Sequence, residues 1–169
     1  MATHPTQNLI ETVKAALVAD DTVGAIGHVF TLLDADWIPP DAEFPVIGLL
    51  DGGTEIEHGP GQAETMLVDV AVYQEIALDQ ADAPSVFGYG TVAPTIGEKG
   101  VLQIHADIRA VLNRQSLTGY YQGRLISETR SEMMPARVQT AEGGEVVEVE
   151  TWAARKVATY EYVAYTDRD

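Results

Sequence analysis

The chain has 169 residues, of which 46% are hydrophobic and 21% are charged, and this composition is typical of a single globular domain covering residues 1–169. It contains no cysteine, which excludes disulfide frameworks, thiolate metal sites and cysteine nucleophiles. A formal net charge of −16 argues against a free-standing nucleic-acid binder, because phosphate recognition depends on clustered lysine and arginine.

The acidic charge is concentrated in the first part of the chain. Residues 1–98 contain 16 acidic side chains and one basic side chain, Lys14, for a net charge of −15, whereas residues 99–169 contain 10 acidic and 9 basic side chains, for a net charge of −1. One interpretation is that the acidic residues keep the protein soluble. The other is that they form a surface that repels phosphate or binds a basic partner.

The N-terminal region does not have the pattern of a targeting segment. The first thirty residues lack a basic flank followed by a continuous apolar run, and no stretch reaches the ~18 apolar residues of a membrane span. We therefore expect a soluble, intracellular protein with no membrane partner.

The first half of the chain predicts one helix and one hairpin. Apolar residues recur at helical spacing over residues 9–17, and the acidic pair at 20–21 marks the end of this helix. The apolar run 44–50 ends at an Asp-Gly-Gly turn signal and predicts a buried strand. Residues 64–76 alternate with period two, as in a strand with one buried face.

The second half predicts a loop, a helix and a second hairpin. Residues 77–100 are rich in glycine and proline with little periodicity, and we interpret them as a contact arm. A helix is expected over 101–114, with His105 among the residues that reach water. Two extended segments, 120–134 and 146–165, then form a long hairpin over residues 120–165.

The last strand is too long for one small domain. Twenty residues at ~3.3 Å each span about 66 Å, so this strand must bend, split or project, and we expect a break at Ala153 and Ala154. Both of its faces carry residues suited to burial, as in a strand covered by a neighbouring subunit. The order α-β-β-α-β-β thus predicts an α+β fold with an open antiparallel sheet, two helices on one face and a projecting hairpin.

No catalytic motif is present in the sequence. Its serines lack the Gly-x-Ser-x-Gly pattern, the segment 97–100 lacks the spacing of a phosphate-binding loop, and the four histidines form no metal-binding pair. We therefore predict no catalytic residues, no cofactor and no metal. Carboxylates brought together by the fold stay open as an alternative, because their separation is not encoded in sequence spacing.

Aromatic residues gather in the second half and are candidates for an oligomer interface. Tyrosine and tryptophan side chains combine an apolar ring with a polar group, which suits an interface where one end is buried and the other meets water. A base-stacking role would require positive charge that this protein lacks. The interface candidates are Tyr120, Tyr121, Trp152, Tyr160 and Tyr162.

The order of these elements resembles the tail terminator, or tail completion, proteins of long-tailed bacteriophages, including the lambda-type terminator. The matching segments are the opening helix 9–17, the strand start 44–47, the alternating strand 66–76, the helix 104–112 and the strand end 160–165. The resemblance covers most of the chain and is a pattern of elements rather than a signature motif. The long 77–100 loop and the extended 120–165 hairpin depart from the family pattern.

The resemblance implies a structural protein without catalytic residues. It would form a hexameric ring that caps the tail tube, stops tube polymerisation and offers a docking surface to the head. Its partners would be copies of itself, the tail tube protein and a head–tail connector or neck protein, and its location would be the neck end of the virion tail. DNA would pass through the ring only as cargo, with Glu55, Glu57, Glu64 and Asp79 as candidate lumen residues that repel it.

Three alternatives stay open at this stage. The two departures also fit another neck component or a tail tube subunit. A different class would be a small enzyme or ligand-binding domain, for which a deep pocket with convergent polar groups is expected. A monomeric adaptor that binds a basic partner through its acidic first half is the third.

Overall fold

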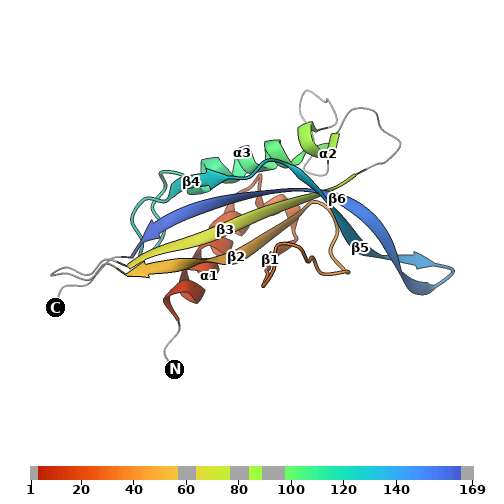
Figure 1. Ribbon diagram of the computed structural model, residues 1–169, viewed down its shortest axis with the longest axis horizontal. Coiled ribbons are helices and arrows are strands. Elements are labelled where there is room, and N and C mark those ends of the chain that lie inside the picture. The colour runs from red at the N-terminus through yellow and green to blue at the C-terminus, as the bar shows by residue number, and fades with distance from the viewer. Residues whose placement is uncertain (1–3, 57–63, 77–83, 89–97, 165–169) are drawn as a thin grey trace.

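The computed structural model describes residues 4–56, 64–76, 84–88 and 98–164, and its fold is α+β, with one open six-stranded sheet and helices (Figure 1). The predicted fold class is therefore confirmed at that level. The helices are α1 (Pro5–Ala19), α2 (Pro84–Phe87) and α3 (Val101–Leu112), with a short 3-10 turn, η1 (Gly24–Ile26). The strands are β1 (Val29–Thr31), β2 (Val46–Ile56), β3 (Glu64–Glu75), β4 (Arg124–Glu128), β5 (Glu132–Glu142) and β6 (Glu145–Val163).

The sheet has the strand order β1-β2-β3-β6-β4, and β5 also pairs with β6. β4 and β5 lie one after the other along the same edge of β6, since β4 pairs with 158–161 and β5 with 145–155. The prediction of a purely antiparallel sheet is wrong in one place, because β1 runs parallel to β2. The segment 32–45 makes this possible by carrying the chain back to the start of β2.

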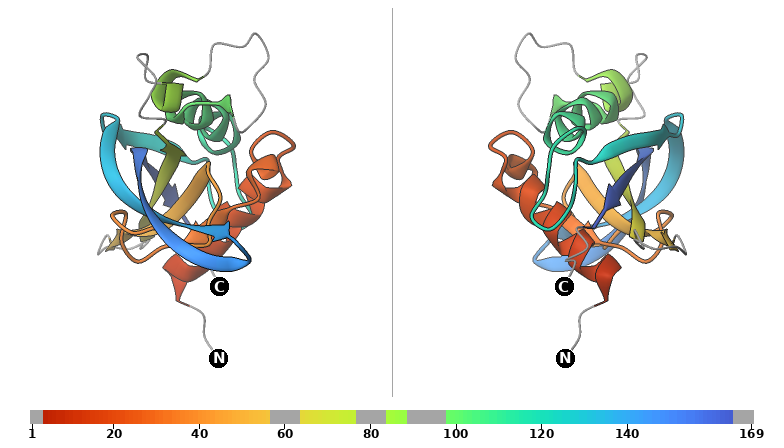
Figure 2. Two further views of the ribbon diagram at one scale, coloured as in Figure 1. Left: turned by 90° about the vertical axis from the view of Figure 1, so that its right-hand side faces the viewer. Right: turned by 90° about the vertical axis from the view of Figure 1, so that its left-hand side faces the viewer.

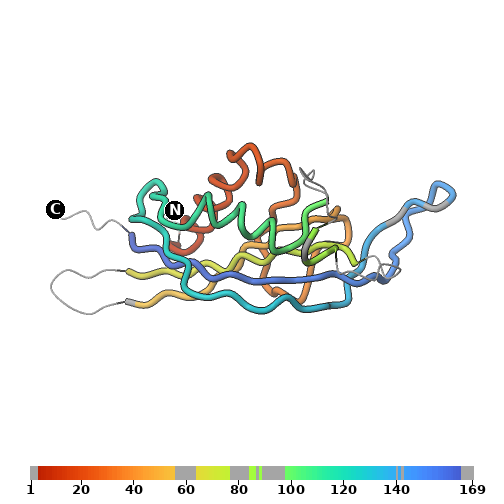
Figure 3. Tube along the Cα trace, turned by 90° about the horizontal axis from the view of Figure 1, so that it is seen from above, coloured from red at the N-terminus to blue at the C-terminus, as the bar shows by residue number. Residues whose placement is uncertain are grey.

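Two hydrophobic cores lie on opposite faces of the sheet. α1 and α3 cover one face (Figures 2 and 3) and pack Leu9, Val13, Ile104 and Ile108 against buried side chains of β2, β3 and β6. The other face is covered by the segment 32–45, whose buried apolar residues contact alternate residues of the same strands. The second core contains Leu32, Ile38, Ala42, Val46, Leu50, Ala71, Tyr73, Met134, Ala136 and Ala153.

The Asp-Gly-Gly turn signal has a different role in the structure from the one the sequence predicts. The Asp-Gly-Gly segment 51–53 is a β-bulge inside β2, where the Asp51 carboxylate accepts a hydrogen bond from the Gly53 N–H at 2.8 Å. β2 therefore continues to Ile56. Of the expected contact arm 77–100, α2 and the residues 88 and 98–100 are described, and 77–83 and 89–97 lie outside the described residues.

Candidate functional site

The β5–β6 hairpin extends past the helices as a two-stranded ribbon formed by residues 135–152 (Figure 1). Its turn is Gly143-Gly144, with φ angles of 59° and 88°. Positive φ at both central residues is the geometry of a tight hairpin turn that matches strand twist, and glycine adopts it without steric cost. β6 is one continuous strand, so the predicted break at Ala153 and Ala154 is wrong. Those residues instead mark where β6 enters the main sheet, pairing with β3 from Ala153 onward.

One face of this ribbon is an outward extension of the second core. Directly opposed residues of antiparallel strands point to the same side, and the pairs Met134–Ala153, Ala136–Thr151 and Val138–Val149 therefore share a face. Met134, Ala136 and Ala153 are buried beneath the segment 32–45. Further out, Val147 and Val149 are 39% and 40% exposed.

We call Val138, Val147 and Val149 the outer stripe. It contains no charged residue, and it continues an apolar surface whose inner part is core. Within the described chain nothing covers Val147 and Val149 to the degree that Met134 and Ala136 are covered. Such a strip of apolar surface next to polar residues is a typical protein–protein contact.

The segment 32–45 is tied to the ribbon and the sheet by polar contacts. The Tyr73 hydroxyl donates to the Ala35 carbonyl at 2.8 Å, and the Arg155 guanidinium donates to the same carbonyl at 2.9 Å. Arg155 also pairs with Asp36 and, at 2.9 Å, with Glu132. These contacts hold the segment over the start of the ribbon.

The burial of Arg155 and its two carboxylate partners act on its pKa in opposite directions. Burial lowers the pKa, and the hydrogen bonds to Asp36 and Glu132 raise it by more, so that the net shift is upward. The guanidinium is therefore a permanent charge whose partners fix its position. Further out, the Gln139 N–H donates to the Pro40 carbonyl at 2.9 Å, so the segment also satisfies part of the free edge of β5.

A shallow hollow of about 400 Å³ lies between this segment and the ribbon. Its carboxylates, Asp36, Glu148 and Glu150, are exposed to solvent, and Glu150 lies 3.8 Å from Arg137. Acid–base chemistry usually relies on carboxyl groups held in a desolvated cleft. This arrangement suits solvated ion pairs better than catalysis.

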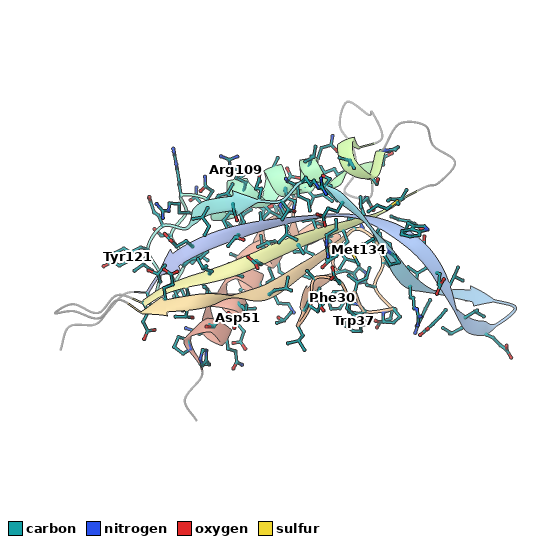
Figure 4. All side chains as sticks on the ribbon, in the orientation of Figure 1. Phe30, Trp37, Asp51, Arg109, Tyr121 and Met134 are labelled. Carbon is teal, nitrogen blue, oxygen red and sulfur yellow. The ribbon has the colours of Figure 1, made fainter. Side chains whose placement is uncertain are left out.

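Three of the five predicted interface residues lie in the core instead. Tyr120, Tyr160 and Tyr162 are at most 3% exposed, and the rings of Tyr120 and Tyr162 meet edge to face at 6.2 Å. The prediction that they form a surface patch is wrong, because α1 and α3 cover the face of β6 to which they point. Tyr121 and Trp152 are 54% and 39% exposed, so these two are available to a partner (Figure 4 labels Tyr121).

The predicted lumen acids are only partly described. Glu55 is exposed near the end of β2, and Glu64 is half-buried at the start of β3, where it lies opposite Ile56. Both therefore lie at the same end of the β2–β3 pair. Glu57 and Asp79 lie outside the described residues.

His105 is buried under α3, contrary to the expectation that it reaches water. Only 2% of it is exposed, its Nε2 donates to the Lys156 carbonyl at 2.8 Å, and its Nδ1 has no hydrogen-bond partner. Lys156 is also buried and donates to the Thr129 carbonyl at 2.5 Å. Burial lowers the pKa of His105, and this outweighs the hydrogen bond to Lys156 and the charge of Glu128, which raise it.

The lowered pKa of His105 predicts a loss of stability in weak acid. Below the ordinary histidine pKa of 6.5, His105 binds a proton in the unfolded chain but not in the folded chain. The free energy of unfolding therefore decreases as the pH is lowered. Urea unfolding of the wild type and of His105→Gln, between about pH 7.5 and about pH 5.5, measures this. We expect the free energy of unfolding of the wild type to fall more than that of the variant over this range. Parallel pH dependences of the two proteins would contradict the assignment.

The sequence interpretation missed the outer stripe and the Arg155 contacts. A signal for the stripe was present, because Gly143-Gly144 between alternating residues is a strong hairpin signature, and it fixes the register that places Val138 opposite Val149. No sequence signal links Arg155 to Asp36, since 118 residues separate them along the chain.

No protein-family model matches the sequence, and no curated protein is significantly similar to it. Within the described ranges, no group of three or more histidine, aspartate or glutamate side chains is arranged to hold a metal ion. No helix among these residues has the length and apolar character needed to cross a membrane.

Proposed function

We propose that this protein is a tail terminator of a long-tailed bacteriophage. In this role it forms a hexameric ring on the last ring of the tail tube, stops tube polymerisation and presents a docking surface to the head. It acts structurally and without a cofactor. Its place is the neck end of the virion tail, and it assembles there in the host cytoplasm.

The observation that carries the proposal is the outer stripe on the projecting ribbon. Val147 and Val149 extend an apolar surface beyond the body of the subunit, where no other described part of the chain covers them, and this surface suits contact with another chain. A ribbon that reaches across to the next subunit is a simple way to link copies in a ring. Tyr121 and Trp152 add exposed aromatic surface of the kind that is enriched at interfaces.

The acidic charge supports passage of DNA through the ring. Six copies carrying −16 each give the ring a strongly negative potential. Glu55 and Glu64, at one end of the β2–β3 pair, are the described candidates for the lumen. A negative lumen lets DNA pass without binding.

Tube assembly in the presence and absence of this chain tests the proposal. The tail tube protein from the same genome is polymerised alone and with the purified chain, and tube lengths are measured by negative-stain electron microscopy. We expect short tubes that end in a cap, and a ring with a mass close to six times 18.2 kDa by sedimentation velocity. Tubes of unchanged length with bare ends would contradict the proposal.

Other outcomes of the same experiment correspond to the related roles. Incorporation along the whole tube would indicate a tail tube subunit. Binding to the connector but not to the tube would indicate another neck component. Either result would replace the terminator role and retain assembly through the ribbon.

A further inference from the structure

One side of the subunit carries a run of exposed acidic residues. The segment 15–56, which includes β1, the covering segment 32–45 and β2, contains no lysine or arginine. Asp36 is engaged by Arg155, and Glu43 lies 3.7 Å from His28. We call four exposed acidic side chains of this segment the acidic edge: Asp34, Asp41, Glu43 and Asp51.

The opposite side of the subunit carries exposed arginines. Between residues 101 and 130 the chain has four arginines and only two acidic residues, Asp107 and Glu128. Asp107 is bound by Lys99 at 2.5 Å, and Glu128 lies 3.9 Å from Lys156, so lysines occupy both carboxylates. Arg130 is set apart, because it lies 3.9 Å from Glu132, which Arg155 joins to Asp36 of the segment 32–45. We call the other exposed arginines the basic edge: Arg109, Arg114 and Arg124, of which Arg124 pairs with Glu161 at 2.8 Å.

The two edges lie on opposite sides of the subunit. α3 and the segment 32–45 cover opposite faces of the sheet, and β1 and β4 are the two ends of its strand order. Figure 4 shows the separation, with Arg109 on one side of the molecule and Asp51 and Trp37 on the other. Each edge also exposes apolar side chains: Leu33 and Trp37 beside the acids, and Tyr121 and Ile126 beside the arginines.

We propose that the basic edge of one subunit binds the acidic edge of the next copy of this chain. This inference rests on the proposed ring and names the surfaces that close it. Two different, complementary surfaces on opposite sides of a subunit give a head-to-tail interface, which generates a ring when the rotation closes. A second copy is the occupant because each chain carries both the acidic surface and the arginines that match it.

The charged residues guide the encounter of two subunits, and the apolar residues beside them then stabilise the interface. Complementary potentials speed the encounter and disfavour wrong pairings, such as two acidic edges. The aromatic and aliphatic residues beside the charges are then removed from water. The acidic edge uses other residues than Glu55 and Glu64, so the same ring retains a negative lumen.

Charge reversal on each edge tests the pairing. The basic-edge variant is Arg109→Glu/Arg114→Glu, and the acidic-edge variant is Asp41→Arg/Glu43→Arg. All four side chains are exposed, so the fold should persist, and circular dichroism checks this. Sedimentation velocity is expected to show each variant alone losing the ring, with subunit affinity reduced at least about tenfold, because like charges now face each other.

A mixture of the two variants provides the matched control. In an alternating ring of six, the reversed acidic edge of one variant meets the reversed basic edge of the other, and the remaining contacts are those of the wild type. We expect the equimolar mixture to regain the wild-type ring mass, and the chain carrying all four substitutions to form rings alone. A nonspecific loss of stability would not be repaired by mixing.

The outcomes separate this inference from the proposed function. If the wild type forms rings and the charge-reversal variants assemble equally well, the edge pairing is wrong and the terminator role is unaffected. The same conclusion follows if the mixture of variants does not regain the ring mass. Absence of wild-type rings both in solution and on tail tubes would contradict both.

Discussion

The substitution Val149→Asp is expected to abolish ring formation while leaving the subunit folded. Val149 is 40% exposed in the single chain, so a carboxylate there can be hydrated and should change the free energy of unfolding by less than about 1 kcal/mol. In the assembled ring the same carboxylate would be buried without a partner, which costs several kcal/mol and weakens the subunit contact at least about 100-fold. Sedimentation velocity and thermal unfolding measure the two effects separately.

Val146→Asp is the matched control for this prediction. Val146 lies three residues earlier on the same strand, is 70% exposed and, from its pairing with Ala141, points to the other face of the ribbon. We expect rings of normal stability from this variant. If both variants lose assembly equally, the outer stripe is not the contact between subunits. Normal rings from Val149→Asp would lead to the same conclusion.

The substitution Arg155→Leu is expected to lower the free energy of unfolding more than Arg124→Leu, which removes an exposed ion pair. Arg155 is a mostly buried cation that holds Ala35, Asp36 and Glu132, with its side chain 15% exposed. Its removal leaves the Ala35 carbonyl with Tyr73 as its one side-chain donor, while Asp36 and Glu132, at 76% and 40% exposure, stay hydrated, so we expect a cost of about 1–2 kcal/mol. The measurement is the free energy of unfolding in urea.

Arg124→Leu serves as the comparison for Arg155→Leu. Arg124 pairs with Glu161 at 2.8 Å, and its side chain is 70% exposed. An exposed ion pair contributes little because water screens it, so we expect a change of about 0.5 kcal/mol or less. Similar losses from the two substitutions would mean that the anchoring of segment 32–45 does not depend on Arg155.

The parts of the fold that depend on local pattern could be predicted from the sequence. Helical spacing located α1 and α3, and period-two alternation located β3, because these patterns reflect which face of an element is buried. The excess length of β6 was also evident, but the break predicted at Ala153 and Ala154 is wrong, because β6 runs on into the main sheet there.

The parts that depend on tertiary contacts could not be predicted. Period-two parity put Tyr160 and Tyr162 on one face of β6, but it could not reveal that α3 covers that face. The parallel pairing of β1 depends on the path of the segment 32–45, which Tyr73 and Arg155 fix through contacts distant in sequence. The bulge at Asp51 has the same residues as a turn, and the pairing with β3 decides between the two.

The central claim is that the outer stripe is covered by a sister subunit, and the labelling rate of a thiol placed in it tests this most directly. The chain has no cysteine, so Val149→Cys and Val146→Cys each introduce a single reactive site. We expect maleimide labelling at position 149 to slow at least tenfold when the protein is concentrated or bound to tail tubes, with little change at position 146. Equal labelling rates at position 149 in the dispersed and assembled protein would contradict the claim.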